Sequence, residues 1–297
     1  MKKSDAHARV MLDPIVKFHP ESAASLGVDG VDADVVDLKP GFVERELAAV
    51  AEAKEKLAVL IAAEKDPRVL QDLQIMHRRA DEELRMSALD EKLVLSYPDL
   101  AQMIFGGMRG LLNTQVAAKR HGAAALRLRR YAGLEAGYTP IALHASAYVR
   151  ARLEVANLRP PAKSQMERDL ASAEQLIDGV GKLCARFKVA GYEAPFEQLR
   201  EQLRGYYTFL RKELLPRAKD DFRLPPELYE MRLARFGVDL KPADIAAKAR
   251  AAYTQLQAEM NAIAVKLAGP GSDYRAVLKK LKEKQLVGPA ILPHYKE

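Results

Sequence analysis

The six histidines are the first residues to examine for metal chemistry, because imidazole is the commonest metal ligand in proteins. They are His7, His19, His77, His121, His144 and His294. A zinc site on a helix needs two histidines about one turn apart and a glutamate beside the first, whereas no two histidines here are three to five residues apart. The H-E-x-x-H motif is therefore absent from the sequence. We expect no catalytic residue, no metal ligand and no cofactor in this chain.

His77 is the histidine with the nearest carboxylate at helical spacing, four residues before Asp81. Arg78 and Arg79 adjoin it, and their positive charges disfavour a bound dication. A surface hydrogen bond or salt bridge is the favoured interpretation for His77.

A second polar set follows helical spacing, because His144, Tyr148 and Arg152 recur every fourth residue. Such residues share one face of a helix and could line a binding pocket. The alternative, which the side chains alone favour, is that they pack or lie partly exposed without binding anything.

The densest run of positive charge could bind an acidic partner. It contains Lys119, Arg120, Arg127, Arg129 and Arg130, and Tyr131 follows it. Cations of this kind can bind phosphates while a tyrosine stacks on a base, so Arg120, Arg127 and Arg130 are candidate binding residues. No nucleic-acid-binding motif surrounds them, and a solvated helical face is the favoured alternative.

The single cysteine and a cluster of glycines carry no recognisable chemistry. Cys184 occupies a core position in an apolar heptad pattern, where cysteine acts as a small apolar residue. As the only cysteine, it can form neither an internal disulfide nor a cysteine-based zinc site. Gly106, Gly107 and Gly110 match neither the phosphate-loop pattern nor the dinucleotide fingerprint.

Apolar residues recur at the three-and-four spacing of a helix along most of the chain. The clearest case predicts helices over 162–189 and 196–217, joined by a short turn as an antiparallel hairpin. Their stripes are Met166, Leu170, Ala173, Ile177, Val180, Cys184 and Phe187 in the first segment, and Leu199, Leu203, Tyr206, Leu210 and Leu214 in the second. No alternating strand pattern of useful length occurs. The sequence therefore predicts an all-α fold, a bundle of long amphipathic antiparallel helices without a significant sheet.

The predicted organisation is a single helical region over 1–297, with an irregular start over 1–40 and a minor seam at 215–226. Hydrophobic residues make up 48% and charged residues 29% of the 297, a composition typical of globular proteins. No apolar run approaches the roughly 18 residues of a membrane span, and the first residues do not form a signal peptide. A cytoplasmic location fits best, although a processed exported form would have the same features. The net charge of +7 is a weak indication of an acidic partner.

The order of several segments resembles a known bacterial family. These segments are His19–Gly27 with the aspartate-rich stretch after it, Asp221–Leu233, Phe236–Val238, and Glu259–Ala264 within a long helix. From about His19 to Leu286 they resemble the amino-terminal half of the family called "domain of unknown function 885". That family is similar to helical gluzincin-type zinc metallopeptidases. The resemblance implies that the zinc-binding helix belongs to a carboxyl-terminal half, none of whose positions exists here.

Two functions remain open after these observations. The first is the non-catalytic helical half of a metallopeptidase-like protein, which forms part of a substrate cleft for a peptide. The zinc half is then supplied by missing sequence or by another chain, and the expected partner is either this catalytic half or a second copy of the chain. The second is a stand-alone helical module that binds an acidic partner such as nucleic acid, the less favoured partner. We expect no membrane partner, and the sequence identifies neither the substrate nor the oligomeric state.

Incompleteness has a structural consequence. If the chain is half of a larger helical body, one face should present apolar side chains that the other half covers. We expect this face on the helix that carries Leu256, Met260, Ile263 and Leu267. The alternative, burial of this stripe within the chain's own bundle, has nearly equal weight.

Overall fold

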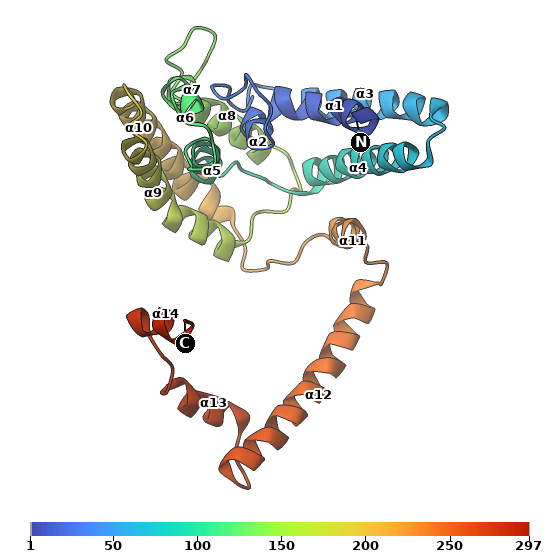
Figure 1. Cartoon of the computed structure of the whole chain (residues 1–297), viewed down its shortest axis with the longest axis vertical. Coiled ribbons are helices and arrows are strands. Elements are labelled where there is room, and N and C mark those ends of the chain that lie inside the picture. The colour runs from blue at the N-terminus through green and yellow to red at the C-terminus, as the bar shows by residue number, and fades with distance from the viewer. Residues whose placement is uncertain (1, 297) are drawn as a thin grey trace. The chain divides into compact units, whose positions relative to one another are not determined.

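The architecture is all-α, as predicted. The structure, a computed structural model, describes residues 2–296, and over this range it contains helices and no strand (Figure 1). Two isolated backbone bridges, Val94 to Arg159 and Ala162 to Lys219, are its only extended pairings within the described range. None of the described helices has the length and hydropathy of a membrane span.

The chain divides into two compact units, Met1–Arg232 (unit 1) and Leu233–Glu297 (unit 2). The boundary lies within α11 (Pro226–Arg235), because this helix begins in unit 1 and ends in unit 2. The predicted single region with a minor seam at 215–226 stays a prediction, and the two units are described separately below.

The start of unit 1 differs from the irregular segment expected over 1–40. Residues in this range form α1 (Lys2–Phe18) and α2 (Pro20–Ser25), and only the stretch that follows is irregular. Pro14 lies inside α1, where proline removes a helical hydrogen bond and normally ends a helix. α1 contacts both α3 and α4, and this tertiary packing outweighs the local signal of Pro14.

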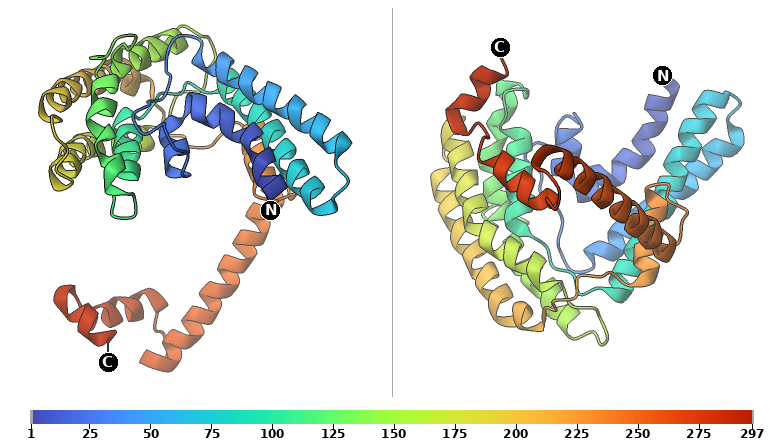
Figure 2. Two further views of the ribbon diagram at one scale, coloured as in Figure 1. Left: turned by 45° about the horizontal axis from the view of Figure 1, so that its top comes forward. Right: turned by 90° about the horizontal axis from the view of Figure 1, so that it is seen from below.

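Helices α1, α3 (Phe42–Ala63) and α4 (Pro67–Leu93) lie side by side in unit 1 (Figure 2). α4 begins at Pro67, because the carboxylate of Asp66 accepts a hydrogen bond from the backbone N–H of Arg68 and Pro67 occupies the first turn. Leu57, Val69 and Leu73 are buried between α3 and α4. The start of α3 and the end of α4 contribute residues to the candidate site described below.

The next helices of unit 1 surround or border its main apolar core. They are α5 (Leu100–Leu111), α6 (Ala118–His121), α7 (Ala123–Tyr131), α8 (Ile141–Leu153), α9 (Lys163–Arg186) and α10 (Glu193–Phe209), followed by a π-helical turn (Leu210–Leu214) and a 3-10 turn (Leu215–Arg217). α2 lies against α5, where the glycines permit a close approach. A Cβ on Gly107 would lie 2.9 Å from Cγ of Glu21, and a Cβ on Gly110 would lie 2.7 Å from Oγ of Ser25.

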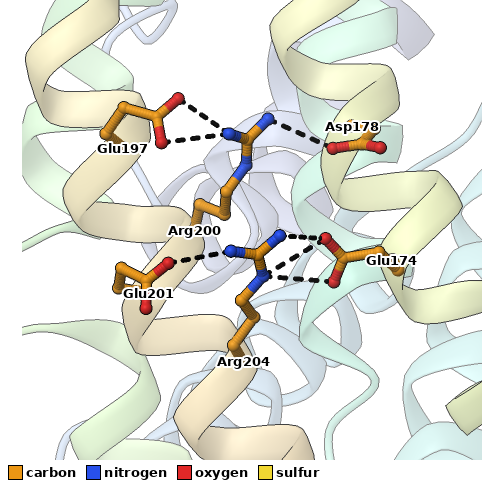
Figure 3. A network of polar contacts seen from close by, with 6 residues as sticks. All are labelled: Glu174, Asp178, Glu197, Arg200, Glu201 and Arg204. Carbon is orange, nitrogen blue, oxygen red and sulfur yellow. Dashed lines mark hydrogen bonds and ion pairs between the residues drawn. The ribbon is translucent and has the colours of Figure 1, made fainter.

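The predicted hairpin is confirmed by α9 and α10. Every residue of the two predicted stripes is buried except Phe187, which is half-buried. Ion pairs across the hairpin join Arg200 to Asp178 and Arg204 to Glu174 (Figure 3). From the first pair to the second, the arginine lies four residues later in α10 while the carboxylate lies four residues earlier in α9. The two helices therefore run antiparallel.

Unit 2 consists of the end of α11, α12 (Pro242–Ala268), α13 (Tyr274–Lys282), a 3-10 turn (Gly288–Ala290) and α14 (Ile291–His294). α12 and α13 pack against each other, and the backbone N–H of Tyr274 donates to the side-chain oxygen of Asn261. Ala264 is the only buried residue of α12. The apolar stripe of α12 is exposed, at 57% for Leu256, 37% for Met260, 54% for Ile263 and 67% for Leu267.

Candidate functional site

The three residues predicted to share a helical face line one pocket, which we call the α8 pocket. His144, Tyr148 and Arg152 project from α8 into a space of about 430 Å³. The opposite wall is formed by the segment Leu38–Gly41 and the start of α3, and Glu91 from the last turn of α4 contributes a carboxylate. The ring of Phe42 lies 5.3 Å from that of Tyr148, centroid to centroid. The pocket therefore combines an aromatic wall with a charged end.

Arg152 and Glu91 form the charged end of the α8 pocket. The guanidinium donates to Oε2 of Glu91 at 2.8 Å, to the backbone oxygen of Glu91, and to the backbone oxygen of Val94 at 2.7 Å. Val94 is the C-cap of α4, so Arg152 places a positive charge at the negative end of that helix. Oε1 of Glu91 accepts from the hydroxyl of Tyr148 at 2.8 Å. The network fixes α8 against α4.

Burial sets the protonation of the uncharged members of this pocket. Burial and the hydrogen bond to Glu91 raise the pKa of Tyr148 to about 12, so the phenol stays neutral near pH 7. Burial lowers the pKa of His144 below its ordinary value of 6.5, so the neutral imidazole is the main form near pH 7. The buried Nε2 of His144 has no hydrogen-bond partner among the residues described. These groups can orient a ligand by hydrogen bonding, but Tyr148 cannot act as a base.

Replacing Arg152 tests whether this network stabilises the pocket. We expect Arg152→Ala to lower the free energy of unfolding by about 2–3 kcal/mol, because the backbone oxygens of Glu91 and Val94 lose charged donors. Urea unfolding followed by circular dichroism measures this change. Arg150→Ala is the control, since Arg150 is exposed on the same helix and its guanidinium lies over the ring of Phe209, 4.6 Å from the centroid, instead of binding backbone oxygens. Equal stability of the two variants would contradict a structural role for Arg152.

The candidate residues of the basic run do not form a shared open surface. All three bind the aspartate loop, which we define as residues 28–34. Arg120 pairs with Asp32 at 2.6 Å, and Arg130 pairs with Asp34. The fully buried Arg127 donates to the backbone oxygen of Gly107 at 2.8 Å and to that of Val31 at 3.5 Å. These contacts give the three arginines a role in holding the loop, and a role in binding a partner stays a prediction.

Cys184 and Asp81 have ordinary structural surroundings. Burial, followed by the charge of Glu193, raises the pKa of the Cys184 thiol to about 12, which keeps it protonated. Asp81 pairs with Lys54 at 2.6 Å. Within residues 2–296, no group of three or more His, Cys, Asp and Glu side chains has an arrangement that could hold a metal ion.

Sequence reasoning did not identify Glu91, Phe42 or the segment Leu38–Gly41 as parts of the pocket. Glu91 lies 57 residues before Tyr148 in the chain. No local spacing pattern relates residues that far apart. The one available signal was a carboxylate near the end of a predicted helix, which is too common to mark a site.

A family model described as "Bacterial protein of unknown function (DUF885)" matches residues 20–294, which is nearly the whole chain. The match includes every residue that lines the α8 pocket. No curated protein matches the chain.

Proposed function

Because the chain belongs to the DUF885 family of bacterial proteins, we propose that it is the non-catalytic helical part of a metallopeptidase-like protein. In this proposal a second segment, absent from this sequence, holds the zinc ion and packs on unit 2. The α8 pocket forms part of the wall of the peptide cleft, where Phe42 and Tyr148 contact an apolar side chain and His144 offers a hydrogen bond.

The observation that carries the proposal is the exposed apolar stripe of α12. Leu256, Met260, Ile263 and Leu267 lie on one face of a helix of 27 residues. Continuous apolar surface of this kind normally marks an interface. Complete burial of a Leu, Ile or Met side chain contributes about 1.5–3 kcal/mol, so covering these four half-exposed side chains would contribute roughly 3–6 kcal/mol. A helical partner with its own apolar stripe would supply that cover.

Zinc content and peptide hydrolysis test this proposal. We expect the chain alone to bind less than 0.1 equivalent of zinc by elemental analysis and to hydrolyse no peptide, since it lacks the H-E-x-x-H pair. We also expect the coding sequence beyond codon 297, in the same frame or the next gene, to encode an H-E-x-x-H helix. Co-expression with that product should then give a complex with one zinc ion and peptidase activity.

Two outcomes would overturn the proposal. One is stoichiometric zinc bound to the chain alone through His77 or His144, together with hydrolysis of a peptide. The other is the absence of any zinc-motif segment from both the same frame and the adjacent gene.

Binding of an acidic partner is the second candidate function, and the charge distribution favours it. Unit 2 contains eleven Lys and Arg against six Asp and Glu, which gives it +5 of the chain's net charge of +7. Lys279, Lys280 and Lys282 are exposed on α13. If this function is correct, a single-stranded oligonucleotide should bind with an affinity that falls steeply as salt is added. Fluorescence anisotropy at 50 and 200 mM salt measures that dependence.

A further inference from the structure

Two pockets of unit 1 adjoin at His19 and Ser22, which line both of them. One has a volume of about 470 Å³ and lies among α1, α3 and α4. The other, of about 530 Å³, lies between α2 and α5. We call the two pockets together the His19 site. It shares no lining residue with the α8 pocket.

The smaller pocket of the His19 site is mainly apolar. The apolar part of its lining consists of Met11, Ile15, Val50, Ile75 and Met76, with Pro14 beside them. Ile75 is 48% exposed, so part of this wall is open to solvent. A cavity of about 150 Å³ is enough to hold benzene. The pocket therefore has room for an aromatic ring or a short alkyl chain.

Carboxylates outnumber cations around His19. Oε1 of Glu46 lies 2.7 Å from Nε2 of His19. Oε2 of Glu83 lies 2.9 Å from the guanidinium of Arg79. Glu21 has neutral donors instead, since its Oε1 accepts from the hydroxyl of Tyr131 and from the backbone N–H of Val36. The site thus has three carboxylates and at most two cations in its lining.

The protonation of His19 agrees with this excess of negative charge. The hydrogen bond to Glu46 raises the pKa of His19 above its ordinary value of 6.5, and the charges of Glu46, Glu21 and Glu83 act in the same direction against burial. Carboxylates that stabilise the imidazolium of His19 also attract a cationic ligand that lies beside them.

We propose that the His19 site binds an amphipathic cation, in which an apolar group carries a primary ammonium. The apolar group occupies the pocket walled by Met11, Ile75 and Met76, and the ammonium lies beside the carboxylates near His19. An uncharged analogue lacks the ionic attraction, and an anionic analogue is repelled by the carboxylates. The inference is independent of the proposed peptidase role, because the site shares no lining residue with the α8 pocket and uses no zinc.

The test is a comparison of three ligands of similar size on the intact chain. They are 2-phenylethylamine, 2-phenylethanol and phenylacetate, titrated at pH 7 while chemical shifts of the methionine methyl groups are followed. We expect the amine to bind about tenfold more tightly than the alcohol and the carboxylate not to bind at all. The shifts should be confined to Met11 and Met76 in the smaller pocket and Met103 in the larger one. Equal affinity for the amine and the alcohol would overturn the proposal.

Substitutions locate the binding. Ile75→Trp should fill the apolar pocket and weaken amine binding at least tenfold, whereas Val59→Trp should leave it unchanged. Val59 is a suitable control because it is an exposed aliphatic residue of α3 that lines neither pocket. Glu83→Gln should weaken amine binding and leave alcohol binding unaltered. Undiminished amine binding by Ile75→Trp, with the helical circular dichroism of the parent chain, would contradict this site.

Discussion

Replacing Arg127 with alanine is expected to lower the free energy of unfolding by about 3–5 kcal/mol, the largest loss for any single arginine of unit 1. Arg127 is completely buried, and its guanidinium joins α7 to both α5 and the aspartate loop through the backbone oxygens of Gly107 and Val31. Alanine would leave both oxygens without this donor and would open a cavity of nearly a whole arginine side chain. Urea unfolding followed by circular dichroism measures the loss.

Arg127→Met separates the hydrogen bonds from the packing. Methionine is unbranched and fills most of the volume, so this variant should lose only about 1–3 kcal/mol, the cost of the unmade hydrogen bonds. Arg129→Ala provides the surface control, since Arg129 is exposed on α7, two residues after Arg127, and its ion pair with Glu135 lies at the surface. If Arg127→Ala were no less stable than Arg129→Ala, the buried guanidinium would have no part in holding the loop.

Gly133→Ala is expected to cost about 3–4 kcal/mol, because two penalties coincide at this residue. Gly133 has φ of +71° and follows the end of α7. Its N–H donates to the backbone oxygen of Arg130, and the N–H of Leu134 donates to the backbone oxygen of Arg129. This is the Schellman arrangement, which favours glycine. A Cβ on Gly133 would also lie 2.4 Å from Cδ and 2.5 Å from the backbone nitrogen of Pro140. Relief of that clash requires the backbone before α8 to move.

Gly137→Ala is the matched control for Gly133→Ala. Gly137 has φ of +83° in the same loop, but no atom lies within 4 Å of the position of a Cβ. It should cost only about 1–2 kcal/mol, the cost of the left-handed conformation alone. Thermal unfolding of both variants measures the difference. Equal melting temperatures would mean that contact between Gly133 and Pro140 does not position α8.

The helices with regular apolar spacing were predictable because their packing is read directly from the sequence. The stripe from Met166 to Cys184 is buried without exception in α9. α1 was missed for a physical reason, since Pro14 is a local helix-breaking signal that contacts with α2, α3 and α4 offset. The burial of Arg127 could not be predicted either, because a run of cations usually forms a solvated helical face.

The candidate site was partly predictable. The spacing of His144, Tyr148 and Arg152 placed them on one helical face, and all three line the α8 pocket. Glu91 accepts hydrogen bonds from both Arg152 and Tyr148, but it belongs to α4. Its position next to α8 depends on the packing of the whole of unit 1, which no local pattern in the sequence indicates. The His19 site was not predicted at all, because its lining comes from α1, α2, α3, α4 and α5.

The proposed function requires the apolar stripe of α12 to be an interface, and sedimentation velocity of the chain alone over 1–100 μM tests this claim most directly. If the stripe is an interface, it should drive reversible self-association of the chain alone, and Ile263→Lys should abolish this association by placing a charge among Leu256, Met260 and Leu267. Val59→Lys, an equivalent change at an exposed aliphatic residue of α3, should associate like the parent chain. A parent chain that sediments as a monomer at every concentration would contradict the claim.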